Sequence, residues 1–292
     1  MRDEVAEFLA HLSIEKGLSQ NTISAYQGDL DRYFEIIDGI EITEENLNQF
    51  IAAERKSGKA EASIARQIVA LRNFAAFMSK ERGIASSISE YSPPKLPKRL
   101  PKAVDVSTIS KILDIYNNSE DIYDIRDRAI LEVLYSAGLR ISELTSLNFD
   151  STRDFLENKT LKVVGKGGKE RIVPIGIPAV KAIEEYVVRA RNTLLKKYTE
   201  RALFINSRGN RISRQSVWQI IQEAAERAGI NEHISPHTFR HSFATHLLDG
   251  GADIRVVQEL LGHASVTTTQ VYTLITIDKL RESYATSHPR AR

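Results

Sequence analysis

The segment SPPKLPKRLPK, residues 92–102, divides this chain of 292 residues. It holds four of the eight prolines and four basic side chains, with no acidic residue. Clustered prolines break helices and favour an extended chain. We therefore interpret residues 91–104 as a basic linker between two domains, residues 1–90 and 105–292. A chain of this length also predicts about two domains.

Composition and charge narrow the class of protein. Residues 1–90 carry 10 basic and 15 acidic side chains, whereas residues 91–292 carry 30 and 23, which permits a polyanionic partner for the second part. The longest purely apolar run, Phe74–Met78, is far shorter than the about 20 residues that cross a bilayer. Because the chain has no cysteine, disulfides, thiol catalysis and Cys-ligated zinc are excluded. We expect a cytoplasmic protein without a membrane partner.

The residues before the linker have the apolar period of helices. Four stripes at helical spacing predict a small bundle of about four helices. The stripes are Val5, Phe8, Leu9 and Leu12; Ile23, Tyr26, Leu30, Phe34 and Ile37; Leu47, Phe50 and Ile51; and Ile64, Ile68, Leu71, Ala75 and Met78.

The residues after the linker mix helices with a short β region. We expect helices over about 107–118 and 122–138, and a hairpin in which residues 160–164 and 169–173 flank a glycine-rich turn. Helical spacing resumes after Pro178, and a further helix begins near Ser235 and ends at Gly250. The fold class that follows is mainly α with a small antiparallel β-sheet.

Several basic, imidazole and phenol side chains could carry chemistry. The turn at Gly165–Lys169 resembles a phosphate-binding loop only superficially, because Glu170 and a strand follow it. Taken singly, each candidate has an ordinary explanation as a cap, a core residue or a surface ion pair. Together they suit phosphoryl transfer without a metal: arginines neutralise phosphate charge, tyrosine attacks, and lysine protonates the leaving oxygen. The candidates are Arg140, Lys166, His237, Arg240, His263 and Tyr272, with Glu143 in support.

The same stretches resemble the tyrosine recombinase, or phage integrase, family, and within it the Xer-type site-specific recombinases. The resemblance reaches from the N-terminal domain to the candidate nucleophile. It is carried by LSQNT (18–22) with Tyr26, AGLRISEL (137–144), VGKGGKERIVP (164–174), HTFRHSFATHL (237–247), LLGH (260–263) and TTQVYT (268–273). One departure is Leu274, where bacterial Xer proteins often have histidine two residues after the nucleophile.

The resemblance implies a two-domain DNA clamp, with a helical, SAM-like core-binding domain followed by the catalytic domain. It also implies a role for each candidate: Arg140 and Arg240 hold the scissile phosphate, Glu143 supports them, Lys166 protonates the 5′-oxygen, His237 is the acid/base, His263 binds a phosphate oxygen, and Tyr272 forms a 3′-phosphotyrosine. Because that link keeps the phosphodiester energy, no nucleotide cofactor is expected. The sequence has no cluster of metal ligands, so no metal is expected either.

The implied partner is a double-stranded DNA recombination site, synapsed by a homo-tetramer through a Holliday junction. The protein would act alone or with a second recombinase, most simply to resolve chromosome dimers. Two alternatives stay open: a simple phage or transposon integrase with the same chemistry, and a DNA-binding relative without catalysis.

Residues outside the catalytic set are candidates for DNA contact, although plain solvent exposure explains each of them as well. They are Asn21, Thr22, Arg66, Lys98, Arg99, Arg211, Arg214 and Gln215. Beyond the nucleophile, Ile277, Leu280 and Tyr284 recur at helical spacing. That stripe either packs on its own domain or, as the resemblance implies, reaches a neighbouring subunit as an assembly helix.

Overall fold

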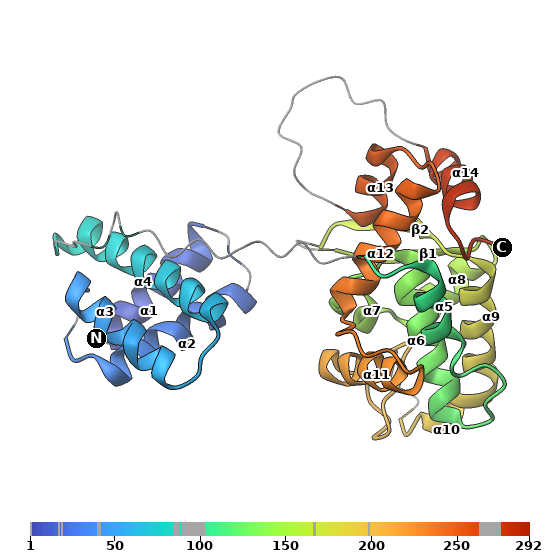
Figure 1. The fold of residues 1–292 in the computed structure, drawn as a ribbon, viewed down its shortest axis with the longest axis horizontal. Coiled ribbons are helices and arrows are strands. Elements are labelled where there is room, and N and C mark those ends of the chain that lie inside the picture. The colour runs from blue at the N-terminus through green and yellow to red at the C-terminus, as the bar shows by residue number, and fades with distance from the viewer. Residues whose placement is uncertain are drawn as a thin grey trace. The chain divides into compact units, whose positions relative to one another are not determined.

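The chain divides into two compact units, residues 1–99 and 100–292 (Figure 1). The structure is a computed structural model. It describes every residue except 1, 17, 19, 40, 41, 85–87, 89, 90, 92–102, 166, 167, 198 and 263–275, and the side chains of residues 2, 154 and 155.

Helices make up the N-terminal unit. Its described part contains α1 (Arg2–Ile14), α2 (Gln20–Ile36), α3 (Glu44–Lys56) and α4 (Glu61–Arg82). Their apolar stripes meet in one core, in which the rings of Phe8, Tyr33, Phe50 and Phe74 are almost fully buried. The predicted bundle of four helices is therefore confirmed.

The C-terminal unit surrounds one hairpin with helices (Figure 1). Strands β1 (Thr160–Val164) and β2 (Glu170–Pro174) pair antiparallel, with Val163 opposite Arg171. The predicted class, mainly α with a small antiparallel sheet, is confirmed. The helices are α5 (Val106–Asp114), α6 (Ile122–Ala137), α7 (Ile141–Ser146), α8 (Phe149–Leu156), α9 (Ile177–Tyr186), α10 (Asn192–Leu194), α11 (Arg214–Arg227), α12 (Pro236–Asp249), α13 (Ile254–Leu261) and α14 (Ile277–Ser287), with a π-helical turn at Val187–Arg191.

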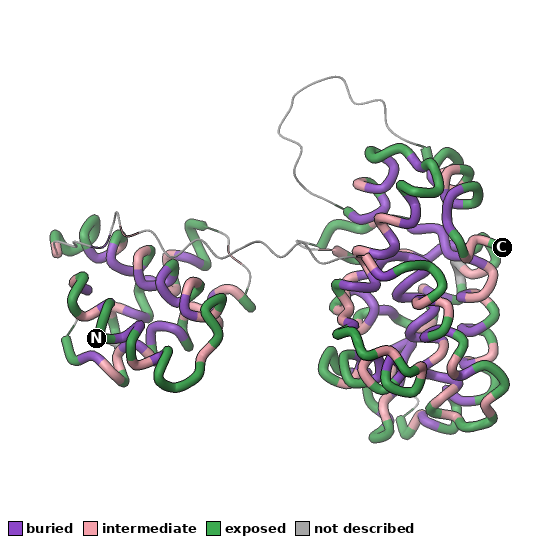
Figure 2. The backbone as a smooth tube through the Cα atoms, viewed as in Figure 1, coloured by how far each residue is buried: buried purple, intermediate pink, exposed green. Residues whose placement is uncertain are grey.

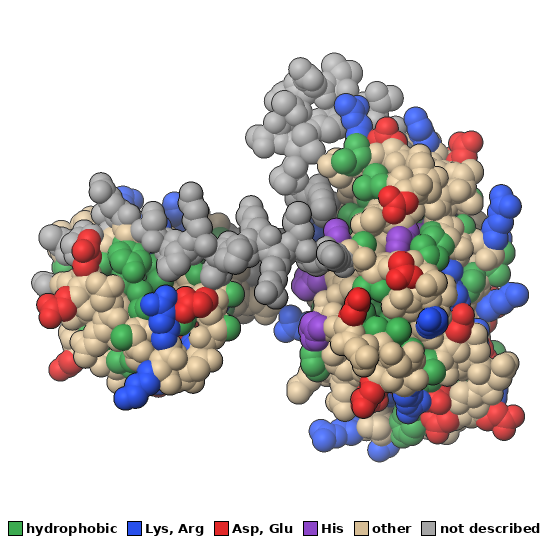
Figure 3. Space-filling view, viewed as in Figure 1, with side chains coloured by type: hydrophobic (Ala, Val, Ile, Leu, Met, Phe, Trp, Pro, Cys, Tyr) green, Lys and Arg blue, Asp and Glu red, His purple; other side chains and the backbone are tan. Residues whose placement is uncertain are grey.

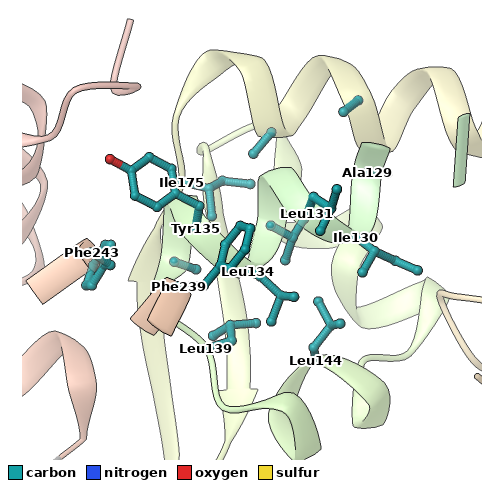
Figure 4. Packing of buried hydrophobic residues seen from close by; sticks show 14 of the residues in the cluster. Ala129, Ile130, Leu131, Leu134, Tyr135, Leu139, Leu144, Ile175, Phe239 and Phe243 are labelled. Carbon is teal, nitrogen blue, oxygen red and sulfur yellow. The ribbon is translucent and has the colours of Figure 1, made fainter. Parts of the chain in front are cut away.

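Helix α6 lies at the centre of this unit. Nearly all its residues from Ile125 to Ala137 are buried, because other helices cover it on several sides. The tube in Figure 2 shows this burial, and Figure 4 shows Leu134 of α6 beside Leu139 and the ring of Phe239 from α12. Asp121 caps the start of α6 by accepting hydrogen bonds from two backbone amides.

The turn that ends α6 requires glycine. Gly138 has a φ of 57°, and a Cβ atom there would lie 2.3 Å from the ring of Phe243. The close contact with α12 fixes the direction in which the chain leaves α6. Leu139 and Arg140 follow at once, so this packing contact positions the first arginine of the candidate site.

The C-terminal stripe is buried on its own unit. Leu280 and Tyr284 of α14 are 7% and 3% exposed, and the Tyr284 hydroxyl lies 2.7 Å from the Ser136 hydroxyl of α6. Beyond α14, Arg290 forms an ion pair with Glu132. Of the two expectations for this stripe, the structure of the single chain therefore shows packing on its own domain. Its role in assembly stays a prediction.

None of the described helices is long and apolar enough to cross a membrane.

Candidate active site

The start of α7 brings Arg140 and Glu143 together. Arg140 is the N-cap residue, and the Oε2 atom of Glu143 accepts a hydrogen bond from its backbone amide at 2.8 Å. The Nη1 atom of Arg140 donates to Oε1 of Glu143 at 3.0 Å. Glu143 thus satisfies an amide at the helix start and pairs with the guanidinium, and it is only 3% exposed.

Helix α12 supplies the second predicted arginine. Ser235 caps this helix and forms a reciprocal capping box with Thr238, as the predicted helix start requires. One turn on, Arg240 donates from Nη1 to the Gly138 carbonyl at 2.7 Å and from Nη2 to the Leu261 carbonyl at 2.5 Å. Its Nη1 atom is also 3.8 Å from Oε2 of Glu143.

Sequence reasoning missed a third arginine. Arg171 of β2 forms a two-pronged pair with Glu143: Nη1 donates to Oε1 at 2.8 Å and Nη2 to Oε2 at 3.0 Å. Its Nε atom donates to the Leu260 carbonyl at 3.0 Å. The signal was present, because Arg171 is two residues before the buried Val173 and therefore shares the inward face of the strand.

The cluster of Glu143 with Arg140, Arg171 and Arg240 has a surplus of positive charge. Burial by itself raises the pKa of Glu143, but hydrogen bonds from Arg171 and from the Arg140 amide outweigh it, so the pKa lies below its usual value. Burial, and next the charge of Arg140, lowers the pKa of Arg240 to about 10. Glu143 is therefore ionised and Arg240 protonated at neutral pH. Three guanidiniums around one carboxylate leave two positive charges to attract a phosphate.

The other catalytic candidates are less defined. His237, in the first turn of α12, is exposed. His246 of the same helix is buried, and its Nδ1 atom lies 2.7 Å from the Tyr135 hydroxyl, so it packs in the core. Lys166, His263 and Tyr272 lie outside the described residues.

The candidates for DNA contact differ in their surroundings. Asn21 at the start of α2 and Arg214 and Gln215 at the start of α11 are exposed, and Thr22 is half-buried. Arg66 of α4 pairs with Asp29 of α2. Lys98 and Arg99 lie outside the described residues.

Arg211 is held by its own unit. Its guanidinium donates to the carbonyls of Thr145 and Leu147, at 2.8 and 3.0 Å, and to the Asn148 side chain at 2.6 Å. These contacts give it a structural role that the sequence did not indicate. Its contact with DNA stays a prediction.

Neither the charge on the face in Figure 3 nor a cluster of metal ligands among the described residues distinguishes the site from the rest of the surface. On the face that Figure 3 shows, basic and acidic side chains are interspersed over each unit. Among the described residues, no group of three or more His, Asp or Glu side chains could hold a metal ion. The distinctive feature is the Glu143 cluster, where a buried carboxylate orders arginines from α7, β2 and α12.

Comparison with known proteins shows which family the chain belongs to. Residues 102–277 match the phage integrase family, and residues 5–82 match its N-terminal SAM-like domain. Tyrosine recombinase XerD of Mycobacterium tuberculosis is 45% identical over 98% of this chain and 97% of the relative.

Solved structures agree with that placement. The crystal structure of XerA recombinase covers 99% of each chain at 28% identity, with a TM-score of 0.51. A lambda integrase tetramer bound to a Holliday junction matches 94% of this chain and 80% of its own at 18% identity, with a TM-score of 0.69, and so shares the fold. The chain therefore belongs to the phage integrase family and is a Xer-type tyrosine recombinase.

Proposed function

We propose that this protein cuts and rejoins duplex DNA at a specific site through a covalent 3′-phosphotyrosine. The observation that carries the proposal is the Glu143 cluster, which holds Arg140 and Arg240 side by side with a surplus of positive charge. A phosphodiester gains negative charge as it becomes pentacoordinate, and fixed guanidiniums stabilise that charge most. The stretches that resemble the family supply a nucleophile, Tyr272, and a general acid, Lys166.

The reaction uses two transesterifications. The Tyr272 hydroxyl attacks phosphorus, its proton passes to His237, and the bond to the 5′-oxygen breaks as Lys166 protonates that oxygen. Arg140, Arg240 and His263 bind the non-bridging oxygens. In the second step, a 5′-hydroxyl from the other duplex attacks the phosphotyrosine and releases Tyr272. One phosphodiester is broken and one is formed, so no external energy source is required.

The proposed partner is a recombination site in double-stranded DNA, bound by several copies of the chain. The fold that it shares with the lambda integrase tetramer on a Holliday junction supports assembly on DNA. Four subunits on two synapsed sites, alone or with a second recombinase, are the finer proposal. The relative named XerD supports chromosome dimer resolution as the biological role.

Covalent trapping tests the chemistry. The wild-type protein is incubated with sheared DNA from its own source, and adducts that survive denaturation are isolated and sequenced. Tyr272→Phe should abolish the adducts but keep DNA binding, because the ring remains and only the nucleophilic oxygen is lost. Tyr123→Phe, at an exposed tyrosine of α6, is the matched control and should keep the adducts. Adducts that persist in Tyr272→Phe would assign the nucleophile elsewhere, and a wild type without adducts would favour a non-catalytic DNA-binding relative.

The position of the adducts tests the biological role. Resolution of a dimeric chromosome requires one site present once per chromosome, whereas a phage or transposon integrase cleaves at the ends of a mobile element. Adducts at one chromosomal site support dimer resolution. If the purified protein cleaves both strands of that site, it acts alone, and cleavage of one strand indicates a second recombinase.

A bridging-sulfur substrate tests Lys166. A 5′-phosphorothiolate leaves without a general acid, so Lys166→Ala should lose about 10²–10⁴-fold in rate on normal DNA and recover part of it on this substrate. Absence of recovery would leave Lys166 as a phosphate contact only.

A further inference from the structure

We infer that Arg171 is a positioning residue for strand cleavage: it fixes Glu143, and through Glu143 the two arginines that bind the phosphate. This inference rests on the proposed function and adds a residue to it. Arg171 is on β2, 28 residues from Glu143 and 89 from Leu260, yet its guanidinium contacts both. It therefore connects the hairpin, the start of α7 and the end of α13.

The first step of the argument is the hydrogen bonding of Glu143. Each carboxylate oxygen accepts two hydrogen bonds, one from Arg171 and one from Arg140. Removal of Arg171 would take away half of these bonds from a carboxylate that is 3% exposed. A buried carboxylate with fewer donors must rotate, admit water or take up a proton. Each of these responses disturbs the Glu143 carboxylate, which positions Arg140.

The second step concerns the end of α13. The last four carbonyls of a helix lack partners within it. The Gly262 amide donates to the carbonyls of Gln258 and Glu259. The next two carbonyls, Leu260 and Leu261, accept from Arg171 and Arg240 respectively. Arg171 and Arg240 thus hold the same helix end. If that end shifts after loss of Arg171, the Leu261 carbonyl that Arg240 contacts shifts with it.

The third step is the shape of the side chain. Arg171 contacts two groups at once: both Nη atoms donate to the Glu143 carboxylate and Nε donates to the Leu260 carbonyl, and its side chain is 13% exposed. Lysine has one nitrogen and cannot present a planar fork to both carboxylate oxygens while reaching a carbonyl. A Cβ atom on Gly262 would lie 3.2 Å from Cδ of Arg171, so the helix end is packed tightly against this side chain. Charge alone should therefore not replace arginine here.

Cleavage kinetics on two substrates test the inference. The substrates are synthetic duplexes with the sequence recovered by adduct mapping, one normal and one with a methylphosphonate at the scissile position. The methyl group removes the negative charge that the arginines neutralise. Arg171→Ala should slow cleavage of the phosphate about 10²-fold, as for a misplacement near the reacting atoms. On the methylphosphonate its loss should shrink to less than about tenfold. A purely structural defect would slow both substrates equally.

Further variants sharpen the test. Arg171→Lys should stay far below the wild-type rate, because it keeps the charge but not the fork. Arg189→Ala, which removes an exposed arginine paired with Glu185, is the matched control and should cleave both substrates normally. The inference is overturned by equal losses of Arg171→Ala on both substrates, by a loss under about twofold, or by full activity of Arg171→Lys.

A measurement without DNA separates this inference from the proposed function. The Nε–Hε NMR signal of Arg240, assigned by its disappearance in Arg240→Lys, should shift in Arg171→Ala and stay in place in Arg189→Ala. If the wild-type protein forms no Tyr272-dependent adduct, the proposed function fails, whereas the NMR result still decides the arrangement. An Arg240 signal that does not respond to Arg171→Ala would show that Arg171 does not position the cluster.

Discussion

Glu143 and Glu132 are both buried in the C-terminal unit, 3% and 0% exposed, but their pKa values are shifted in opposite directions. Glu143 accepts four hydrogen bonds and lies near three guanidiniums, which hold its pKa below the usual value against the effect of burial. Glu132 pairs with Arg290 through Oε1, while Oε2 has no partner among the described residues. Burial dominates there, so the pKa of Glu132 is raised even beside an arginine.

The difference shows that a buried charge is stabilised by the number and geometry of its donors rather than by the presence of one counter-charge. Around Glu143, guanidiniums come from three separate elements, which is typical of a site that must keep its charge. At Glu132 one arginine from the C-terminal tail meets a carboxylate on the central helix, which is typical of a structural contact. Four predictions, with their control variants, test this contrast. Trp218, the single tryptophan, lies on α11 and so reports unfolding of the C-terminal unit.

Arg290→Ala should have the largest effect. It leaves Glu132 buried without its counter-charge, and breaking one side of a buried pair costs about 3–5 kcal/mol. The free energy of unfolding, from urea titration followed by Trp218 fluorescence, should fall by that amount. The double variant Arg290→Ala/Glu132→Gln should regain much of the loss. A loss below about 1 kcal/mol would mean that the tail does not stabilise this unit.

Glu143→Gln should destabilise the same unit by about 2–3 kcal/mol, because it replaces charged hydrogen bonds to Arg140 and Arg171 with weaker ones. Glu132→Gln is the matched comparison and should change stability by less than about 1 kcal/mol, since folding already disfavours its charge. Both values come from urea unfolding at neutral pH. Equal effects of the two substitutions would remove the distinction between the two glutamates.

His288 should make the tail sensitive to acid. Burial, and next the charge of His246, lowers its pKa to about 3, so the folded state holds it neutral. The unfolded chain binds a proton below a pH of about 6.5, and stability is therefore lost as the pH falls through that value. Relative to His288→Phe, the wild-type protein should lose about 2 kcal/mol between pH 7 and pH 5.

The control variant for His288→Phe is His233→Asn, which replaces an exposed histidine of the same unit. If wild type and His288→Phe follow parallel stability curves from pH 7 to pH 5, the buried neutral state of His288 is wrong.

Ser213→Ala should have the smallest effect. Ser213 caps α11 by accepting a hydrogen bond from the Ser216 amide at 3.0 Å, and it is exposed. Loss of such a cap costs about 1 kcal/mol. Because the group is neutral and solvated, the cost should not depend on pH between 5 and 7. A loss as large as that of Glu143→Gln would contradict the ranking by burial.

Local patterns predicted much of the fold. Helical spacing and caps predicted the four N-terminal helices, α5, α6 and α12, and the glycine-rich turn predicted the hairpin. Helices α7 and α8 were missed, because they are short and lack a long apolar period. The site was predicted in part: the pairing of Arg140 with Glu143 follows from their spacing, whereas the approach of Arg240 depends on where α12 packs.

The sequence by itself determined where most of the longer helices form, where several of them end and which side chains can carry the chemistry, because these depend on neighbours a few positions apart. Tertiary structure alone decided that Arg171 joins Glu143 to the end of α13 and that Arg211 binds carbonyls at the distant end of α7. It also decided that the tail is buried on α6. The physical reason is that hydrogen bonds and ion pairs of this kind form between residues far apart in sequence, and only packing of the elements brings them within about 3 Å.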